Sequence, residues 1–282
     1  MNEALQAALL GVVEGVTEFL PVSSTGHLIV VSDLLGFRDS GGTFEIVIQL
    51  GAVLAVVWFY RRDLWTRLRT IPVSAHSRRF WRNVIVACLP AALLGFTLEE
   101  FITSVLFSPV VVAISLILGG LVLGWVDRPR PGARGGVRVA ADGPHDVDGT
   151  GPRGLDAITL RQAFLIGLAQ TVALIPGVSR SGSSIVGGLL TGLDRPTATA
   201  FSFYLAMPVL GGATLYELLQ NVGQIAASGR AALFGIGLLV SFVTALLAVS
   251  WLLRYVAGHS FLGFALYRIL AGLLILLWVA RR

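Results

Sequence analysis

The hydrophobic pattern divides the chain into two halves that begin in the same way. In each half a short apolar segment is interrupted by a polar elbow and then resumes, at residues 3–35 and again at 159–193. Longer apolar runs follow each segment, and they approach the roughly 20 residues that a helix needs to cross a bilayer. These runs are 44–60, 83–98 and 105–126 in the first half, and 197–219, 231–255 and 261–280 in the second. The pattern predicts an all-α polytopic membrane protein.

The two halves also align with each other. Shifting the chain by 156 residues brings Glu14 onto Gln170 and Ser23 onto Ser179. Identity among small and apolar residues is weak evidence, but the repeated order of half-helix, serine elbow, half-helix and long spans is stronger. We therefore predict two repeats, each built from a re-entrant helical hairpin and three transmembrane helices.

The number of spans predicts how the repeats are related. Three spans, an odd number, start the second repeat on the opposite side of the membrane, so the repeats have inverted topology. Inverted repeats with broken helices bring their elbows together near the bilayer midplane, where a substrate site is expected. The predicted units are a first repeat at 1–126 with its hairpin at 3–35, a flexible cytoplasmic linker at 127–157, and a second repeat at 158–282 with its hairpin at 159–193.

Composition supports a membrane protein. The chain of 282 residues is 55% hydrophobic and 13% charged, with a mean hydropathy of +0.80. All 21 basic residues are arginine, and many cluster in 61–82 and in the linker. Because positively charged connections stay in the cytoplasm, this clustering indicates topology and contact with membrane lipids, and nucleic acid is not expected as a partner.

The first elbow carries unusual chemistry for an apolar segment. Glu14 and Glu18 lie one helical turn apart, Pro21 stops the helix, and Ser-Ser-Thr-Gly-His follows at 23–27. Ionisable residues at membrane depth are costly and usually face a cavity, a partner or a substrate path. A purely structural network bonded to the elbow backbone is the alternative for the two glutamates.

The second elbow supplies the missing positive charge. Arg180 lies between Ser179 and Ser181 and is followed by Gly182. A guanidinium suits bidentate phosphate recognition, and backbone N–H groups at a helix N-terminus add anion affinity. Carboxylates beside a phosphate repel it unless a divalent cation intervenes, so Glu14 and Glu18 are candidate ligands for Mg²⁺ or Ca²⁺. Metal-assisted phosphoryl transfer accounts for these residue types together.

The residue types leave the nucleophile open. Ser24, His27 and a metal-bound water are all candidates, and His27 is also a candidate acid–base group. Glu45 and Gln49, one turn apart in the first long run, are predicted to line the same cavity, with structural support of the site as the alternative.

Three stretches of the sequence closely resemble the bacterial undecaprenyl-diphosphate phosphatase family, also called the bacitracin-resistance family. They read EGVTEFLPVSSTGH at 14–27, PGVSRSG at 176–182 and FEIVIQLGAVLAVV at 44–57. The resemblance implies an enzyme of the bacterial cytoplasmic membrane that hydrolyses undecaprenyl diphosphate to the monophosphate with a divalent cation. It also implies an active site that opens to the outer side.

The resemblance also assigns roles by motif. It implies an acidic pair at Glu14 and Glu18 and a serine-to-histidine elbow that includes Ser24, Thr25 and His27. The candidate catalytic residues are Glu18, Ser24, His27 and Arg180, and the candidate phosphate-binding residues are Ser23, Thr25, Ser179, Arg180, Ser181 and Gly182. Ser183-Ser184 replaces the family's usual Ala-Thr, and the linker is long for the family.

Two other functions compete with hydrolysis of a polyprenyl diphosphate lipid at this stage. A lipid-phosphate transporter or flippase would use the same inverted-repeat architecture. The soluble-type acid phosphatase superfamily has similar PSGH and SR pieces, but its downstream His-and-Asp segment has no counterpart after Arg180. A homodimer is the assembly left open by the sequence.

Overall fold

The computed structural model describes residues 2–37, 43–128, 154–227 and 229–281, and every regular element in these ranges is a helix. The fold is therefore all-α, as predicted. The helices are α1 Glu3–Thr17, α2 Ser24–Leu35, α3 Thr43–Phe59, α4 Arg61–Arg69, α5 Ala75–Phe101, α6 Pro109–Val126, α7 Leu160–Thr171, α8 Arg180–Leu190, α9 Arg195–Ala227, α10 Ala231–Gly258 and α11 Leu262–Ala280. Single turns of other helix types occur at Ile102–Leu106, Gly154–Ala157 and Val172–Leu174.

Five of these helices, α5, α6, α9, α10 and α11, are long and apolar enough to cross a membrane. The predicted first span corresponds to α3, which has 17 residues and meets the length criterion only together with α4, from which it is bent by 65°. The helices confirm a polytopic membrane protein with five or six candidate spans among the described residues.

The arginine-rich segment at 61–82 differs from the predicted loop. Residues 61–69 form α4, and α5 already begins at Ala75. Arg67 is buried and forms ion pairs of 2.7 Å with both Asp63 and Asp156. The charge pattern indicated a segment between two spans. It could not show that Arg67 is buried, because this burial depends on Asp156, which is distant in sequence.

Both ends of the predicted linker 127–157 lie in ordered structure. Asp127 is buried, pairs with Arg195 at 2.5 Å, and accepts a 2.6 Å hydrogen bond from the backbone N–H of Phe261. Residues 154–157 form a helical turn. Asp127 and residues 154–157 therefore belong to folded structure, and residues 129–153 of the predicted linker lie outside the described residues.

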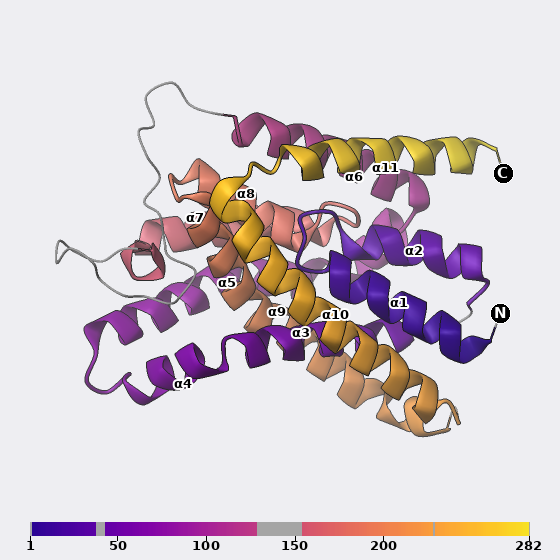
Figure 1. The fold of residues 1–282 in the computed structure, drawn as a ribbon, viewed down its shortest axis with the longest axis horizontal. Coiled ribbons are helices and arrows are strands. Elements are labelled where there is room, and N and C mark those ends of the chain that lie inside the picture. The colour runs from indigo at the N-terminus through magenta and orange to yellow at the C-terminus, as the bar shows by residue number, and fades with distance from the viewer. Residues whose placement is uncertain (1, 38–42, 129–153, 228, 282) are drawn as a thin grey trace.

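The two hairpins pack in corresponding ways. Helix α1 lies beside α2 and crosses α10, and α7 lies beside α8 and crosses α5 (Figure 1). A Cβ atom on Gly11 would lie 2.6 Å from the carbonyl oxygen of Gly237 in α10, and one on Gly167 would overlap the carbonyl of Ala87 in α5. These matching contacts agree with the two-repeat hypothesis, but both the repeats and their inverted relation stay predictions.

Helices α6 and α11 run side by side along one edge of the molecule (Figure 1). The largest cluster of buried apolar side chains draws on α3, α9 and α10 and includes Phe19 of the first elbow. Phe19 is fully buried, and its ring meets Phe203 edge-on with 5.4 Å between centroids. The polar elbows are therefore held by an apolar core rather than exposed on a surface.

Candidate active site

Each elbow ends in a serine with an unusual backbone. Ser23 has φ 71° and Ser179 has φ 75°, and they are the only non-glycine residues with positive φ in the part of the chain that the structure describes. Each serine directly precedes a helix, so α2 and α8 both begin at the elbows. Strained residues of this kind concentrate at functional sites, and helix N-termini favour anions.

The structure brings the two elbows into contact. Arg180 Nη2 lies 3.2 Å from Glu18 Oε1, and both side chains are buried. The hydroxyl of Ser24 donates a 2.5 Å hydrogen bond to the other oxygen, Glu18 Oε2. Ser181 of the second elbow donates to the backbone carbonyl of Leu20 in the first at 2.8 Å. Three predicted catalytic residues therefore form one cluster.

Arg180 is held on two sides and keeps one donor free. Its Nη1 donates to the carbonyl of Ser202 in α9 at 2.9 Å, and its guanidinium carbon lies 5.7 Å from the centre of the Phe19 ring. The buried Nε of Arg180 has no hydrogen-bond partner within the described residues. An orphaned buried N–H is costly and calls for an explanation, and this donor is the group that Arg180 has left to offer to an anionic oxygen.

His27 is oriented through both ring nitrogens. Nδ1 lies 2.7 Å from the carbonyl oxygen of Ser23, and Nε2 lies 2.5 Å from the hydroxyl of Tyr267 in α11. A carbonyl can only accept, so Nδ1 carries the proton and Nε2 accepts from Tyr267. The tyrosine and histidine rings also stack, with 5.5 Å between centroids. His27 is thus held with Nε2 unprotonated and hydrogen-bonded to Tyr267.

The second glutamate lies deeper. Glu14 is 1% exposed, and its buried Oε1 has no hydrogen-bond partner among the described residues. It lies within electrostatic range of Glu18, Glu45 and Arg180. Its repeat counterpart Gln170 is buried too, and both of its amide atoms lack partners in the same ranges. A carboxylate with an unsatisfied oxygen beside a second carboxylate fits a divalent cation.

No group of three or more His, Cys, Asp or Glu side chains suited to a metal ion occurs in the described part of the chain. Mg²⁺ commonly takes one or two carboxylates and completes its shell with water and substrate phosphate. The pair Glu14 and Glu18 fits that mode rather than a cage made entirely of protein ligands.

The other residues predicted for the site lie in the two elbows or in α3. Ser179 accepts a 3.1 Å hydrogen bond from the N–H of Gly182, and its hydroxyl lies 3.1 Å from that of Ser181. Thr25 is half-buried in the first turn of α2. Gln49 accepts from Thr214 of α9 at 2.9 Å, a contact that joins two helices.

The sequence matches the family model described as bacitracin resistance protein BacA over residues 7–274. The chain belongs to this family. An undecaprenyl-diphosphatase of Bordetella pertussis is 44% identical over 277 residues, covering 98% of this chain and 96% of the relative. Two relatives named undecaprenyl-diphosphatase 1 are each 50% identical to this chain. The one from Burkholderia thailandensis covers 96% of this chain and 94% of the relative, and the one from Paraburkholderia xenovorans covers 97% of this chain and 94% of the relative.

Sequence reasoning missed several residues at the elbows of this BacA-family chain. Ser202 contacts Arg180 and also accepts from Ser184 at 2.7 Å. Tyr267 and Arg268 reach the site from α11, and Arg268 is 1% exposed. An arginine within an otherwise apolar span is the one signal that could have identified α11 as part of the site.

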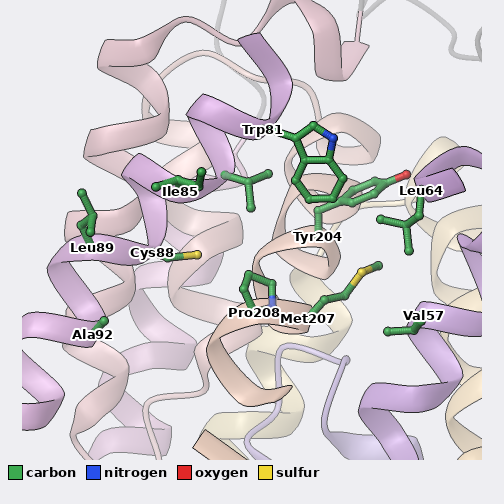
Figure 2. A pocket seen from close by; sticks show the side chains of 11 residues that line it. Val57, Leu64, Trp81, Ile85, Cys88, Leu89, Ala92, Tyr204, Met207 and Pro208 are labelled. Carbon is green, nitrogen blue, oxygen red and sulfur yellow. The ribbon is translucent and has the colours of Figure 1, made fainter. Parts of the chain in front are cut away.

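A separate apolar cavity of about 450 Å³ lies between α3, α5 and α9 (Figure 2). Trp81 and Tyr204 stand at one end of it, and Val57 and Met207 border it from α3 and α9 (Figure 2). Apolar side chains dominate its lining. In this member of the BacA family the polar elbows and this cavity are therefore distinct features.

Proposed function

We propose that this chain hydrolyses undecaprenyl diphosphate to undecaprenyl phosphate and inorganic phosphate. The contact of Ser24, Glu18 and Arg180 across two elbows carries the proposal, because it joins a hydroxyl, a base and a phosphate-binding cation. The names of the relatives support the same substrate and favour hydrolysis over the transporter alternative. The product recycles the lipid carrier of cell-wall synthesis.

The first step is attack by Ser24. Arg180 binds the terminal phosphate through its free Nε, and the N-termini of α2 and α8 add to the attraction. Ser24 Oγ forms a bond to the terminal phosphorus, the bridging P–O bond breaks, and undecaprenyl phosphate leaves with the bridging oxygen. Glu18 takes the hydroxyl proton through the 2.5 Å hydrogen bond.

The second step releases phosphate from Ser24. A water molecule attacks the phosphoserine, the Ser24–phosphorus bond breaks, and inorganic phosphate leaves. The water passes its proton to the Tyr267 hydroxyl, which in turn gives its own proton to His27 Nε2, the nitrogen that the contact with Ser23 leaves unprotonated. Glu18 then returns its proton to Ser24, and His27 releases its added proton to water, which restores the starting state.

Glu14 and Glu18 would hold a divalent cation, Mg²⁺ or Ca²⁺. When bound, the cation would neutralise negative charge on the phosphate, which the buried carboxylates would otherwise repel. The unpartnered Oε1 of Glu14 supports this proposal.

The proposed setting is the bacterial cytoplasmic membrane, with the site open to its outer side. The apolar helices and the family support a multi-pass membrane protein, and the arginines of α4 and early α5 are proposed to face the cytoplasm. Membrane lipids surround the spans. A homodimer stays a prediction, which the mass of the protein–detergent particle tests.

The deciding experiment measures phosphate release from undecaprenyl diphosphate by purified protein in detergent micelles with Mg²⁺ or Ca²⁺. Wild-type protein should release phosphate, and Arg180→Ala and Ser24→Ala should lose at least about 100-fold in rate while remaining folded. Rapid acid quenching with labelled substrate should trap phosphate on wild-type protein and not on Ser24→Ala.

Ser32→Ala is a matched control, because it removes a hydroxyl from the same helix, α2, eight residues from Ser24, and leaves Ser24 intact. Normal turnover by Arg180→Ala would refute the assignment of the phosphate site. A labelled His27 instead of Ser24 would overturn the proposed nucleophile and leave the reaction standing. Transport of the lipid across vesicles without phosphate release would establish the transporter alternative.

A further inference from the structure

Arg268 is a buried charge that the proposed reaction does not use. It lies in α11, it is 1% exposed, and it takes part in none of the ion pairs found among the described residues. An arginine at membrane depth is costly unless its donors are satisfied. The hydrogen-bond acceptors of Arg268 therefore indicate what this arginine contributes to the structure.

All the hydrogen bonds of Arg268 go to backbone carbonyls, and they reach three separate segments. Nη1 donates to Pro21 in the first elbow at 3.1 Å. Nη2 donates to Val178 at 2.8 Å and to Gly177 at 3.3 Å, both in the second elbow. Longer contacts of 3.4 Å reach Ser115 and Leu116 in α6. One guanidinium thus joins both elbows to the α6–α11 pair.

The elbows need such donors. Irregular backbone at membrane depth is tolerated only when its polar groups are satisfied by the surrounding protein. A guanidinium offers five N–H groups in a rigid plane, whereas an ammonium offers three on a flexible stem. Only an arginine can serve carbonyls of both elbows from one fixed position.

Helix α6 is shaped to admit this side chain. A Cβ atom on Gly119 would lie 2.7 Å from the guanidinium carbon of Arg268 and still closer to Nη2. A glycine at this position therefore leaves the space that Arg268 fills. Gly124 on the same helix is different, because the nearest atom to its Cβ would be 3.4 Å away, on Ala265.

We propose that Arg268 is a positioning residue that holds the two elbows in register, so that Ser24 and Glu18 meet Arg180. Pro21 lies three residues before Ser24, and Val178 lies two residues before Arg180. Loss of the shared donor frees both elbow carbonyls and lets the elbows move apart. The kinetic test of this inference rests on the proposed hydrolysis, whereas a second test, the distance between α2 and α8, does not.

The kinetic test compares Arg268→Ala and Arg268→Lys with wild-type protein. Both variants should lose about 100-fold in kcat, because a displacement of about 1 Å between reacting groups has that effect, while KM changes less. Added guanidinium ion should partly restore Arg268→Ala. Arg254→Gln is the matched control, because Arg254 is exposed and bonds only a carbonyl of its own helix, that of Ser250.

Gly119→Ala offers an independent perturbation that keeps the arginine. It should lower kcat in the same way as Arg268→Lys, whereas Gly124→Ala should not. This pair keeps the proposal testable if Arg268→Ala fails to fold. Full kcat in folded Arg268→Lys and in Gly119→Ala would overturn the proposal, as would a loss of folded protein with unchanged kcat per folded molecule.

A distance measurement separates this proposal from the proposed function. Spin labels at Leu34 and Leu190, exposed near the ends of α2 and α8, report the relative position of the helices that begin at the elbows. With Cys88 replaced by serine, double electron–electron resonance should give a broader distance distribution in Arg268→Ala than in wild-type protein. An unchanged distribution overturns the positioning role. Absence of phosphate release by wild-type protein refutes only the hydrolysis.

Discussion

Replacing Gly15 with alanine tests whether the crossing of α1 and α10 sets the active site. A Cβ on Gly15 would lie 2.4 Å from the carbonyl oxygen of Ser241 and 2.8 Å from the backbone nitrogen of Ala245, and it would overlap the Thr244 hydroxyl. Ordinary contact starts at 3.4 Å, so the Cβ must move by about 1.0 Å, the difference between 3.4 Å and the 2.4 Å contact. Overpacking of this kind costs about 1–3 kcal/mol of folding free energy.

The shift should also reach the chemistry. Gly15 lies between Glu14 and Glu18, so movement of α1 carries the acidic pair away from Arg180. A misplacement of about 1 Å lowers the rate of a positioned reaction by about 100-fold. We therefore expect Gly15→Ala to lose both thermal stability and phosphate release.

The assay combines thermal unfolding in detergent micelles with phosphate release per folded molecule. Gly235→Ala is the matched control, because it lies in α10 and its Cβ would meet no atom within 4 Å. It should be neutral or more stable by about 0.5–1 kcal/mol. If Gly15→Ala behaves like Gly235→Ala in both measurements, the close helix crossing does not position the acidic pair.

Three further perturbations have distinct expected results. Glu14→Gln should raise the divalent-cation concentration for half-maximal phosphate release by about tenfold or more in a titration from EDTA-treated protein; an unchanged midpoint would exclude Glu14 as a ligand. Tyr267→Phe removes the donor to His27 Nε2 and should lower kcat by about 3- to 10-fold, as expected for one hydrogen bond of about 0.5–1.5 kcal/mol. Asp156→Asn weakens the pair with Arg67 and should destabilise the fold by about 1–3 kcal/mol in a denaturant titration, with unchanged phosphate release per folded molecule; equal stability would contradict the buried pair.

Local patterns predicted the helices well and their connections less well. The interruption at Pro21 and the repeated serine elbow identified both hairpins, since these signals lie within a few residues of one another. The segment at 61–82 was predicted as a cytoplasmic loop because its arginines cluster between two apolar runs. Its helix α4 is stabilised by the Arg67–Asp156 pair, and no local pattern links those two positions.

The same distinction applies to the site. The two motifs supplied Glu18, Ser24 and Arg180, and the structure places these three in contact. Ser202 and Arg268 could not be placed from the sequence, because each acts through a backbone or hydroxyl contact with a distant segment. Such contacts leave no motif in the sequence. An arginine within an apolar span does indicate that hydrogen-bond acceptors lie nearby, but it does not indicate which ones.

The contacts of Arg268 have a consequence for biosynthesis. Synthesis at about 5–20 residues per second separates Arg180 from Arg268 by roughly 4–18 s, so α11 is made after both elbows. Its arginine enters the membrane at a cost of about 2.5–3.5 kcal/mol at a helix centre. The carbonyls of Pro21 and Val178, already in place by then, offset that cost. The buried arginine of α11 thus depends on carbonyls that are made earlier, and the two elbows lack their shared donor until α11 is in place.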